Sequence, residues 1–259
     1  MAKLRWAIPD LISPSYFPVV AAIELGYLKE EGYDADLELI FPVTKTYEEL
    51  RDGRLDFAAG SAHPVLHAFP NWEGAKLLCA QSQNMYWFLV VRSDLNPKRG
   101  DLSVVKGLRI GAAPGVDLGL KQMLKDGGID IERDNVQIGP VTAANAAGVS
   151  FGVTAAKALE EGTLDAFWAN GMGAEVAVRK GIGTVVVDAR RGDGPPPAVD
   201  YTFSCVVATD RMIAEQPEVV RAGIRAVRKA QRVLKADPSK ATEAARNVFP
   251  PEETELIAE

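Results

Sequence analysis

The sequence predicts an α/β protein built from two similar β-α-β lobes, with a ligand cleft between them and two crossing strands. Three observations carry this prediction. Short apolar strand-like runs alternate with helical segments along the chain, which is typical of parallel α/β construction. Two local patterns occur in the first half of the chain and recur in the same order in the second half. Two long apolar strands flank the second copy.

The first repeated pattern is a strand followed by a loop and a helix. Residues 4–10 have the strand and loop, and the helical run 21–28 follows them. Residues 108–114 have the same strand and loop, followed by the helical run 118–124. A single copy of such a pattern is common, so it becomes informative only with a second one.

The second repeated pattern ends a helix at a glycine and then begins a strand. Residues 50–60 and 159–169 share it, with Gly53 and Gly162 suited to the left-handed cap of a helix. Because both patterns recur in the same order, we expect two lobes of the same β-α-β-α-β plan.

The chain is expected to cross between the lobes twice. Residues 85–91 and 201–207 are long apolar strands that flank the second copy of the patterns. We therefore assign residues 1–91 and 206–259 to lobe one, and residues 92–205 to lobe two.

The composition is that of a globular protein, with 47% hydrophobic and 25% charged residues. The net charge is −6 and no face rich in lysine or arginine is apparent, which argues against nucleic acid as a partner. No apolar run is long enough to span a membrane. Cys79 and Cys205 lie in apolar strand-like runs, so we expect two buried free thiols, while a disulfide between them stays open.

Candidate ligand contacts lie in the loops that follow strands, because open α/β sheets bind ligands beyond the carboxyl ends of their strands. The first such loop contains Asp10 and Ser13 and ends at Tyr16. Ser13 can cap the helix that follows or donate to a ligand, and the two roles are compatible.

A second loop in lobe one follows the strand at 57–60. Ser61 offers a hydroxyl group and an amide, and Ala62 and His63 come directly after it. His63 and His67 are four residues apart, as on one helix face. We expect one to line the cleft and the other to pack, rather than a metal site.

Lobe two supplies three further candidate segments. Gly115, Val116 and Asp117 open a helix, where free amides favour an anion, although Asp117 can simply cap that helix. Phe151 begins another helix, and Asn170 follows the strand at 166–169.

Catalytic motifs are sparse. The sequence has no Gly-x-Ser-x-Gly elbow, phosphate-binding loop or dinucleotide fingerprint, and we expect no metal and no cofactor. Asp56 and Asp165 fall at equivalent places in the two copies, which favours a structural role for both.

The run from Ser13 to Gly32 resembles the start of solute-binding proteins of the nitrate/sulfonate/taurine class, which share a domain with thiamin-pyrimidine synthesis proteins. Residues 50–59, 106–111 and 159–170 fit the same pattern. The resemblance implies a type 2 periplasmic-binding-protein-like fold with hinge closure. The cysteine-rich signature of the pyrimidine-synthesising enzymes is absent.

The resemblance also implies a function: capture of a small polar, anionic or aromatic molecule for the membrane permease of an ABC-type importer. It implies ligand contacts by Ser13, Tyr16, Ser61, Ala62, Gly115, Val116 and Asn170. We expect a periplasmic monomer, and because no leader precedes the first strand a cytoplasmic location is the alternative.

Two other functions stay open on this fold. One is a cytoplasmic decarboxylase or dehydratase of a cyclic or aromatic acid, with His63 as its general acid or base. The other is a cytoplasmic ligand sensor without catalysis.

Overall fold

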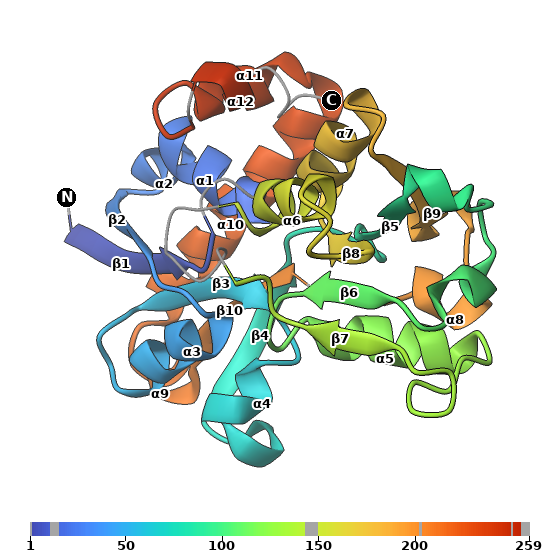
Figure 1. Cartoon of the computed structure of the whole chain (residues 1–259). Coiled ribbons are helices and arrows are strands. Elements are labelled where there is room, and N and C mark those ends of the chain that lie inside the picture. Colours follow the sequence, from blue (N-terminus) through green and yellow to red (C-terminus); the bar gives the residue numbers. More distant parts are fainter. Residues whose placement is uncertain (1, 11–15, 143–149, 202–203, 250, 255–259) are drawn as a thin grey trace. The chain divides into compact units, whose positions relative to one another are not determined.

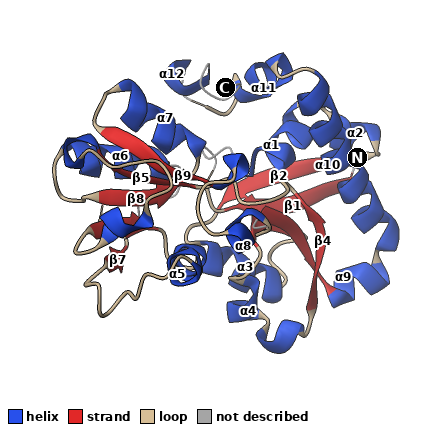
Figure 2. Ribbon diagram, turned by 90° about the vertical axis from the view of Figure 1, so that its right-hand side faces the viewer, coloured by secondary structure: helices blue, strands red, loops and turns tan. Residues whose placement is uncertain are grey.

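The computed structural model describes residues 2–10, 16–142, 150–201, 204–249 and 251–254. The chain divides into two units: unit 1 comprises Met1–Gln81 and Ser204–Glu259, and unit 2 comprises Ser82–Phe203. Figures 1 and 2 show the elements of both units.

Unit 1 contains a five-stranded sheet of order β2-β1-β3-β10-β4. Its strands are β1 (Ala2–Ile8), β2 (Tyr33–Leu39), β3 (Phe57–Ser61), β4 (Ala75–Ala80) and β10 (Ser204–Thr209). Its helices are α1 (Phe17–Glu24), α2 (Tyr27–Glu30), α3 (Val43–Arg51), α4 (Val65–Ala68), α9 (Asp210–Glu215), α10 (Pro217–Ala236), α11 (Ser239–Ala245) and α12 (Pro251–Thr254), with a 3₁₀ turn η2 at Pro70–Trp72.

The strand directions give this sheet one edge at which loops gather. β1 pairs in parallel with β2 and β3, whereas β10 runs antiparallel between β3 and β4. Strands β1, β2, β3 and β4 therefore end at the same edge, where β10 begins. We call this the carboxyl edge of the sheet.

Helices cover both faces of the sheet in unit 1. The long helix α10 packs beside α1 and α2 on one face (Figure 1). A Cβ atom at Gly223 would lie 3.2 Å from Trp6 and 3.3 Å from Phe57, so a glycine here lets α10 approach the stacked rings of those two residues. On the other face, α3 buries Tyr47 and Leu50 against the sheet.

Unit 2 has a second five-stranded sheet, of order β7-β6-β8-β5-β9. Its strands are β5 (Phe88–Arg92), β6 (Arg109–Ala112), β7 (Gln137–Gly139), β8 (Ala166–Ala169) and β9 (Gly183–Asp188). Its helices are α5 (Asp117–Asp126), α6 (Phe151–Glu160), α7 (Gly171–Arg179) and α8 (Pro196–Val199), and its 3₁₀ turns are η3 (Ser93–Leu95), η4 (Leu102–Val105) and η5 (Ala189–Arg191).

The second sheet repeats the strand directions of the first. β6 pairs in parallel with β7 and β8, and β5 runs antiparallel between β8 and β9. β6, β7, β8 and β9 thus end at a carboxyl edge where β5 begins. The predicted α/β class with two similar lobes is confirmed.

The unit boundaries differ from the sequence-based assignment at both crossings. Residues up to 91 were expected in lobe one, but strand β5 pairs with β8 and β9 and so belongs to unit 2. At the second crossing, β10 joins the sheet of unit 1 from Ser204 onward, two residues earlier than expected. The length of an apolar run predicts a strand, but only its pairing partners decide which sheet receives it.

Both cysteines are free thiols. Cys79 pairs across the ladder with Val206, so these two side chains lie on the same face of the sheet. Cys205 immediately precedes Val206 and therefore points to the opposite face. Burial raises the pKa of Cys205 to about 12 and that of Cys79 to about 11.

No helix in the described part of the chain has the length and apolar character needed to cross a bilayer.

Candidate functional site

The carboxyl edge of unit 1 brings Tyr16 and Ser61 together. The Tyr16 hydroxyl lies 3.5 Å from Ser61 Oγ, and both side chains are buried. Tyr47, on α3, donates a hydrogen bond of 2.8 Å from its hydroxyl to the carbonyl oxygen of Ser61. The loop after β3 is therefore fixed by two tyrosines from two different helical segments.

Glycine at position 60 makes this arrangement possible. A Cβ atom there would lie 2.7 Å from Val43 Cγ2 and 2.8 Å from the Tyr47 hydroxyl, which is closer than real Cβ contacts. The role of Gly60 is thus to admit Tyr47 to the end of β3.

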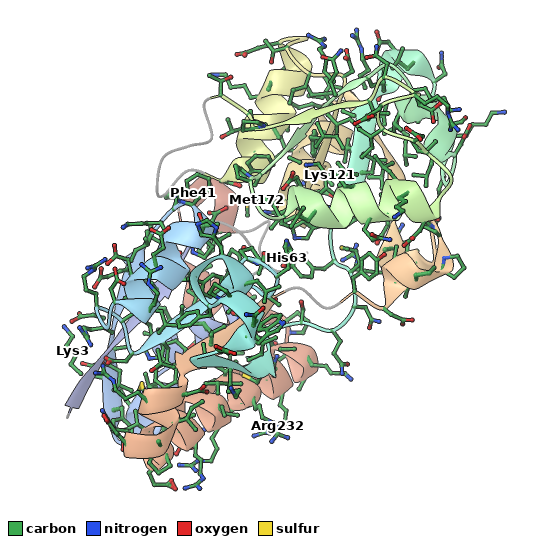
Figure 3. The ribbon with its side chains drawn as sticks, turned by 90° about the horizontal axis from the view of Figure 1, so that it is seen from below. Lys3, Phe41, His63, Lys121, Met172 and Arg232 are labelled. Carbon is green, nitrogen blue, oxygen red and sulfur yellow. The ribbon has the colours of Figure 1, made fainter. Side chains whose placement is uncertain are left out.

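The other predicted residues of unit 1 lie around this edge. Asp10, just after β1, is buried with 8% of its surface exposed. Ala62 and His63 are half-buried in the turn before α4, and His63 is marked in Figure 3. Ser13 lies outside the described residues.

The expected pairing of two histidines on one helix face is wrong. Helix α4 begins at Val65, so His63 precedes it and only His67 lies on it. His67 is exposed, and its Nε2 atom lies 3.5 Å from a carboxylate oxygen of Glu48. Across the described residues, no cluster of three or more histidine, cysteine or acidic side chains could hold a metal ion.

In unit 2, the loop from β6 to α5 is held by its own aspartate. Gly115 has a φ of 86°, and its amide donates a hydrogen bond of 3.0 Å to Asp117 Oδ1. Asp117 also pairs at 2.5 Å with Lys121, one turn further along α5. Val116, which lies between Gly115 and Asp117 in the sequence, is buried. The Asp117 carboxylate therefore neutralises Lys121 and orders the loop before α5, but its amide partner, Gly115, precedes the helix, so the expected capping of the helix itself is not what it does.

Helices α6 and α7 both begin at the carboxyl edge, and each has a side-chain cap. Ser150 Oγ accepts a hydrogen bond of 3.3 Å from the Val153 amide, next to the buried Phe151. Asn170 Oδ1 accepts one of 3.5 Å from the Gly173 amide, and Asn170 is 3% exposed. Both residues satisfy amides that a helix start leaves without an intrahelical partner.

The starts of α6 and α7 touch through backbone. A Cβ atom at Gly173 would lie 2.6 Å from the carbonyl carbon of Gly152, and one at Gly152 would lie 2.9 Å from Asn170 Oδ1. Such contact is possible only between glycines. The two helix starts therefore form one rigid corner, and their positive dipole ends meet there.

Sequence reasoning missed two side chains at these edges. Tyr47 lies within α3, and nothing in its local pattern indicates that it reaches the end of β3. Arg190 follows strand β9, and its place after a strand was the one available signal. Figure 3 labels Lys121 on α5 and Met172 in the first turn of α7.

Comparison with protein-family models decides the family. Residues 13–241 match the model described as NMT1/THI5 like. The chain belongs to this family. The predicted resemblance to solute-binding proteins that share a domain with thiamin-pyrimidine synthesis proteins is thereby confirmed. No curated protein sequence matches the chain.

Solved structures of sulfonate- and nitrate-binding proteins share the fold. The alkanesulfonate-binding protein SsuA from Xanthomonas axonopodis pv. citri, bound to MOPS, is 16% identical with a TM-score of 0.75, covering 100% of this chain and 83% of that one. The periplasmic nitrate-binding protein NrtA from Synechocystis PCC 6803 is 14% identical with a TM-score of 0.75, covering 98% of this chain and 69% of that one.

A third structure, the periplasmic aliphatic sulphonate binding protein SsuA from Escherichia coli, is 14% identical with a TM-score of 0.73, covering 100% of this chain and 82% of that one. At these identities the likeness establishes the fold. The predicted periplasmic-binding-protein-like architecture is confirmed, and these three structural neighbours are described as binding proteins for sulfonates or nitrate.

Proposed function

We propose that this protein is the solute-binding component of an ABC-type importer in the periplasm. It captures one small polar molecule, anionic or aromatic, with the carboxyl-edge loops of both units. The observation that carries the proposal is the duplication of these loops. Each of two sheets with the same strand directions presents buried polar side chains at its carboxyl edge, in a family whose fold is shared with sulfonate- and nitrate-binding proteins.

The proposed contacts combine hydroxyl, amide and backbone groups. In unit 1 they are Asp10, Ser13, Tyr16, Ser61, Ala62 and His63, and in unit 2 they are Gly115, Val116, Asp117, Phe151 and Asn170. Buried polar groups next to a site favour ligands that complete their hydrogen bonds.

The proposal is of binding without chemistry. A general acid or base needs a partner group that positions or activates it. His63 is half-buried in a turn, the Ser61 hydroxyl lies 3.5 Å from that of Tyr16, and Cys205 is a buried thiol whose pKa is raised. We infer that the ligand is released unaltered to a membrane permease.

A thermal-shift screen tests the proposal. The panel contains sulfonates, carboxylates, nitrate and neutral pyrimidines, each added to the purified chain. A ligand at one hundred times its dissociation constant adds about 2.7 kcal/mol to the free energy of unfolding. For a chain of this length, that raises the melting temperature by about 5–10 °C. A panel in which no compound raises the melting temperature contradicts the proposal.

Mass spectrometry separates binding from catalysis. The tightest compound of the screen is incubated with the protein and then recovered. We expect the unmodified compound alone. Product in molar excess over the protein would show turnover, and loss of that turnover in His63→Ala would then support the enzyme alternative.

A further inference from the structure

Arg190 stands at the carboxyl edge of unit 2, where strand β9 ends. Asp188, the last residue of that strand, accepts hydrogen bonds from Arg190 Nε at 2.9 Å and from Nη2 at 3.0 Å. The Asp188 side chain is 5% exposed, while that of Arg190 is 51% exposed. A buried carboxylate therefore fixes the guanidinium group in one orientation at a solvent-accessible place.

The phenyl ring of Phe88 also packs against the guanidinium group of Arg190. The Cζ atom of Arg190 lies 4.6 Å from the ring centroid of Phe88, within the range of a cation–π contact. Phe88 and Asp188 are directly paired residues of β5 and β9. Of the described residues, none accepts a hydrogen bond from Arg190 Nη1. Asp188 and the Phe88 ring thus orient the guanidinium group of Arg190, while its Nη1 donors remain available to a ligand.

The charge balance around Arg190 is positive. Arg191 also pairs with Asp188, at 3.3 Å, so one carboxylate faces two guanidinium groups. The other cation noted at this edge, Lys121, is neutralised by Asp117. In a chain with a net charge of −6, this is a local positive excess.

The start of helix α7 lies next to the same ring. A Cβ atom at Gly171, the first residue of α7, would lie 3.5 Å from Phe88. Gly173 in the first turn of this nine-residue helix touches Gly152 at the start of α6. The positive ends of two helices therefore lie near the ring that Arg190 covers, and both favour an anion there.

We propose that Arg190 binds the acid group of the ligand, and that the ligand is an organic anion such as a sulfonate or a carboxylate. This inference rests on the proposed function and extends it, because it assigns recognition of the acid group to unit 2. Guanidinium donors match the planar carboxylate and the sulfonate oxygens. Arg190 is already oriented by Asp188 and Phe88, so little conformational entropy is lost when the anion binds.

The test uses acids and their neutral amides as matched probes: benzenesulfonate with benzenesulfonamide, benzoate with benzamide, and methanesulfonate with methanesulfonamide. Dissociation constants are measured by calorimetry on the full chain. We expect at least one acid to bind tenfold or more tightly than its amide, because a hydrogen bond between charged groups outweighs a neutral one. The sulfonate and carboxylate pairs show which acid is preferred.

Variants then assign the preference to Arg190. In Arg190→Met the acid is expected to bind at least tenfold more weakly and the amide to bind unchanged. Arg190→Lys keeps the charge and is expected to retain part of the preference. Arg179→Met is the matched control, since it removes the same charge at the far end of α7. It is expected to leave both dissociation constants within about twofold. Circular dichroism and the melting temperature confirm that each variant is folded.

The possible results separate the two proposals. If a neutral probe binds and no acid binds more tightly than its amide, the solute-binding function stands and the role of Arg190 is rejected. If the acid preference is the same in folded Arg190→Met and Arg190→Lys as in the wild type, the role of Arg190 is also rejected. If no probe binds but nitrate or a neutral pyrimidine of the thermal-shift panel does, this inference is rejected and the solute-binding function stands; if nothing in either set binds, both fail.

Discussion

Asp165 accepts three hydrogen bonds from Arg109: from the backbone amide at 3.0 Å, from Nε at 2.8 Å and from Nη2 at 2.9 Å. Arg109 opens β6 and Asp165 immediately precedes β8, so the pair joins two parallel strands at the edge opposite to the candidate loops. Asp56 and Arg5 make the same three contacts in unit 1. These contacts support the structural role that the sequence predicts for Asp56 and Asp165.

Asp165→Asn tests the contribution of this pair to stability. The hydrogen bonds from Arg109 lower the pKa of Asp165 to about 2, and its side chain is only 14% exposed. A lowered carboxyl pKa contributes stability that is complete above the unfolded value near 4 and is lost as the pH falls through the folded value. We expect the variant to lose about 1–2 kcal/mol at pH 7.

The pH dependence identifies the cause. Urea unfolding of wild type and variant should differ by a constant amount above about pH 5, and roughly half of the difference should be gone by about pH 3. Asp36→Asn is the control, because this half-exposed carboxylate pairs only with the exposed Lys3 among the residues that have been described. A difference for Asp165→Asn that does not vary with pH would contradict the assignment to its charge.

Gly173→Ala tests the contact between α6 and α7. The added methyl group would lie 2.6 Å from the backbone of Gly152, which no side-chain rotation can relieve. We expect a loss of about 1–3 kcal/mol in the free energy of unfolding. Gly139→Ala is the matched control, since nothing lies within 4 Å of its Cβ position. Equal stability of the two variants, measured by urea unfolding, would show that the helices separate readily.

Tyr47→Phe tests the support of the loop after β3. The variant removes one hydroxyl group and leaves the carbonyl oxygen of Ser61 without this buried donor. We expect a loss of about 1–2 kcal/mol in stability and a weaker affinity for the tightest ligand. Calorimetry on the folded variant measures the affinity. An unchanged affinity would show that Ser61 does not need Tyr47 to contact the ligand.

Gly115→Val tests whether the loop before α5 contacts the ligand. Gly115 has a φ of 86° and Gly128, beyond the other end of α5, has a φ of 80°, so valine is strained at both positions. We expect Gly115→Val and Gly128→Val to destabilise the protein by a similar amount, of the order of 1–3 kcal/mol. Only the first should weaken ligand binding. Equal affinities in both variants would remove this loop from the site.

The duplicated fold could be predicted because each copy of the pattern is local. A helix end, a glycine cap and a strand are encoded by consecutive residues, and residues 50–60 and 159–169 contain them in the same order. The helix caps Ser150 and Asn170 are equally local, since each acts on an amide three residues ahead, but they were not assigned from the sequence.

Contacts between distant strands could not be predicted in this way. Phe88 lies under Arg190 only because β5 enters the sheet beside β9, in a register that places Phe88 opposite Asp188. The same pairing places β5 in unit 2, whereas the sequence-based assignment put it in lobe one. Nor does the sequence near Tyr47 show that its hydroxyl reaches Ser61, because that contact depends on the absence of a side chain at Gly60.

Ser61, a proposed ligand contact, pairs with Ser204 at the point where the chain returns to unit 1. Ser61 is the last residue of β3, and Ser204 is the first residue after the chain re-enters unit 1. In unit 2, Phe88 at the start of β5 pairs in the same way with Ala169, the residue before Asn170. On the proposed function, strain created by a ligand at Ser61 would reach the second crossing through a single ladder pair, without a relay of side chains through the core. Substitutions in helices remote from these edges should alter the stability of the protein while leaving its mechanical response to a ligand intact.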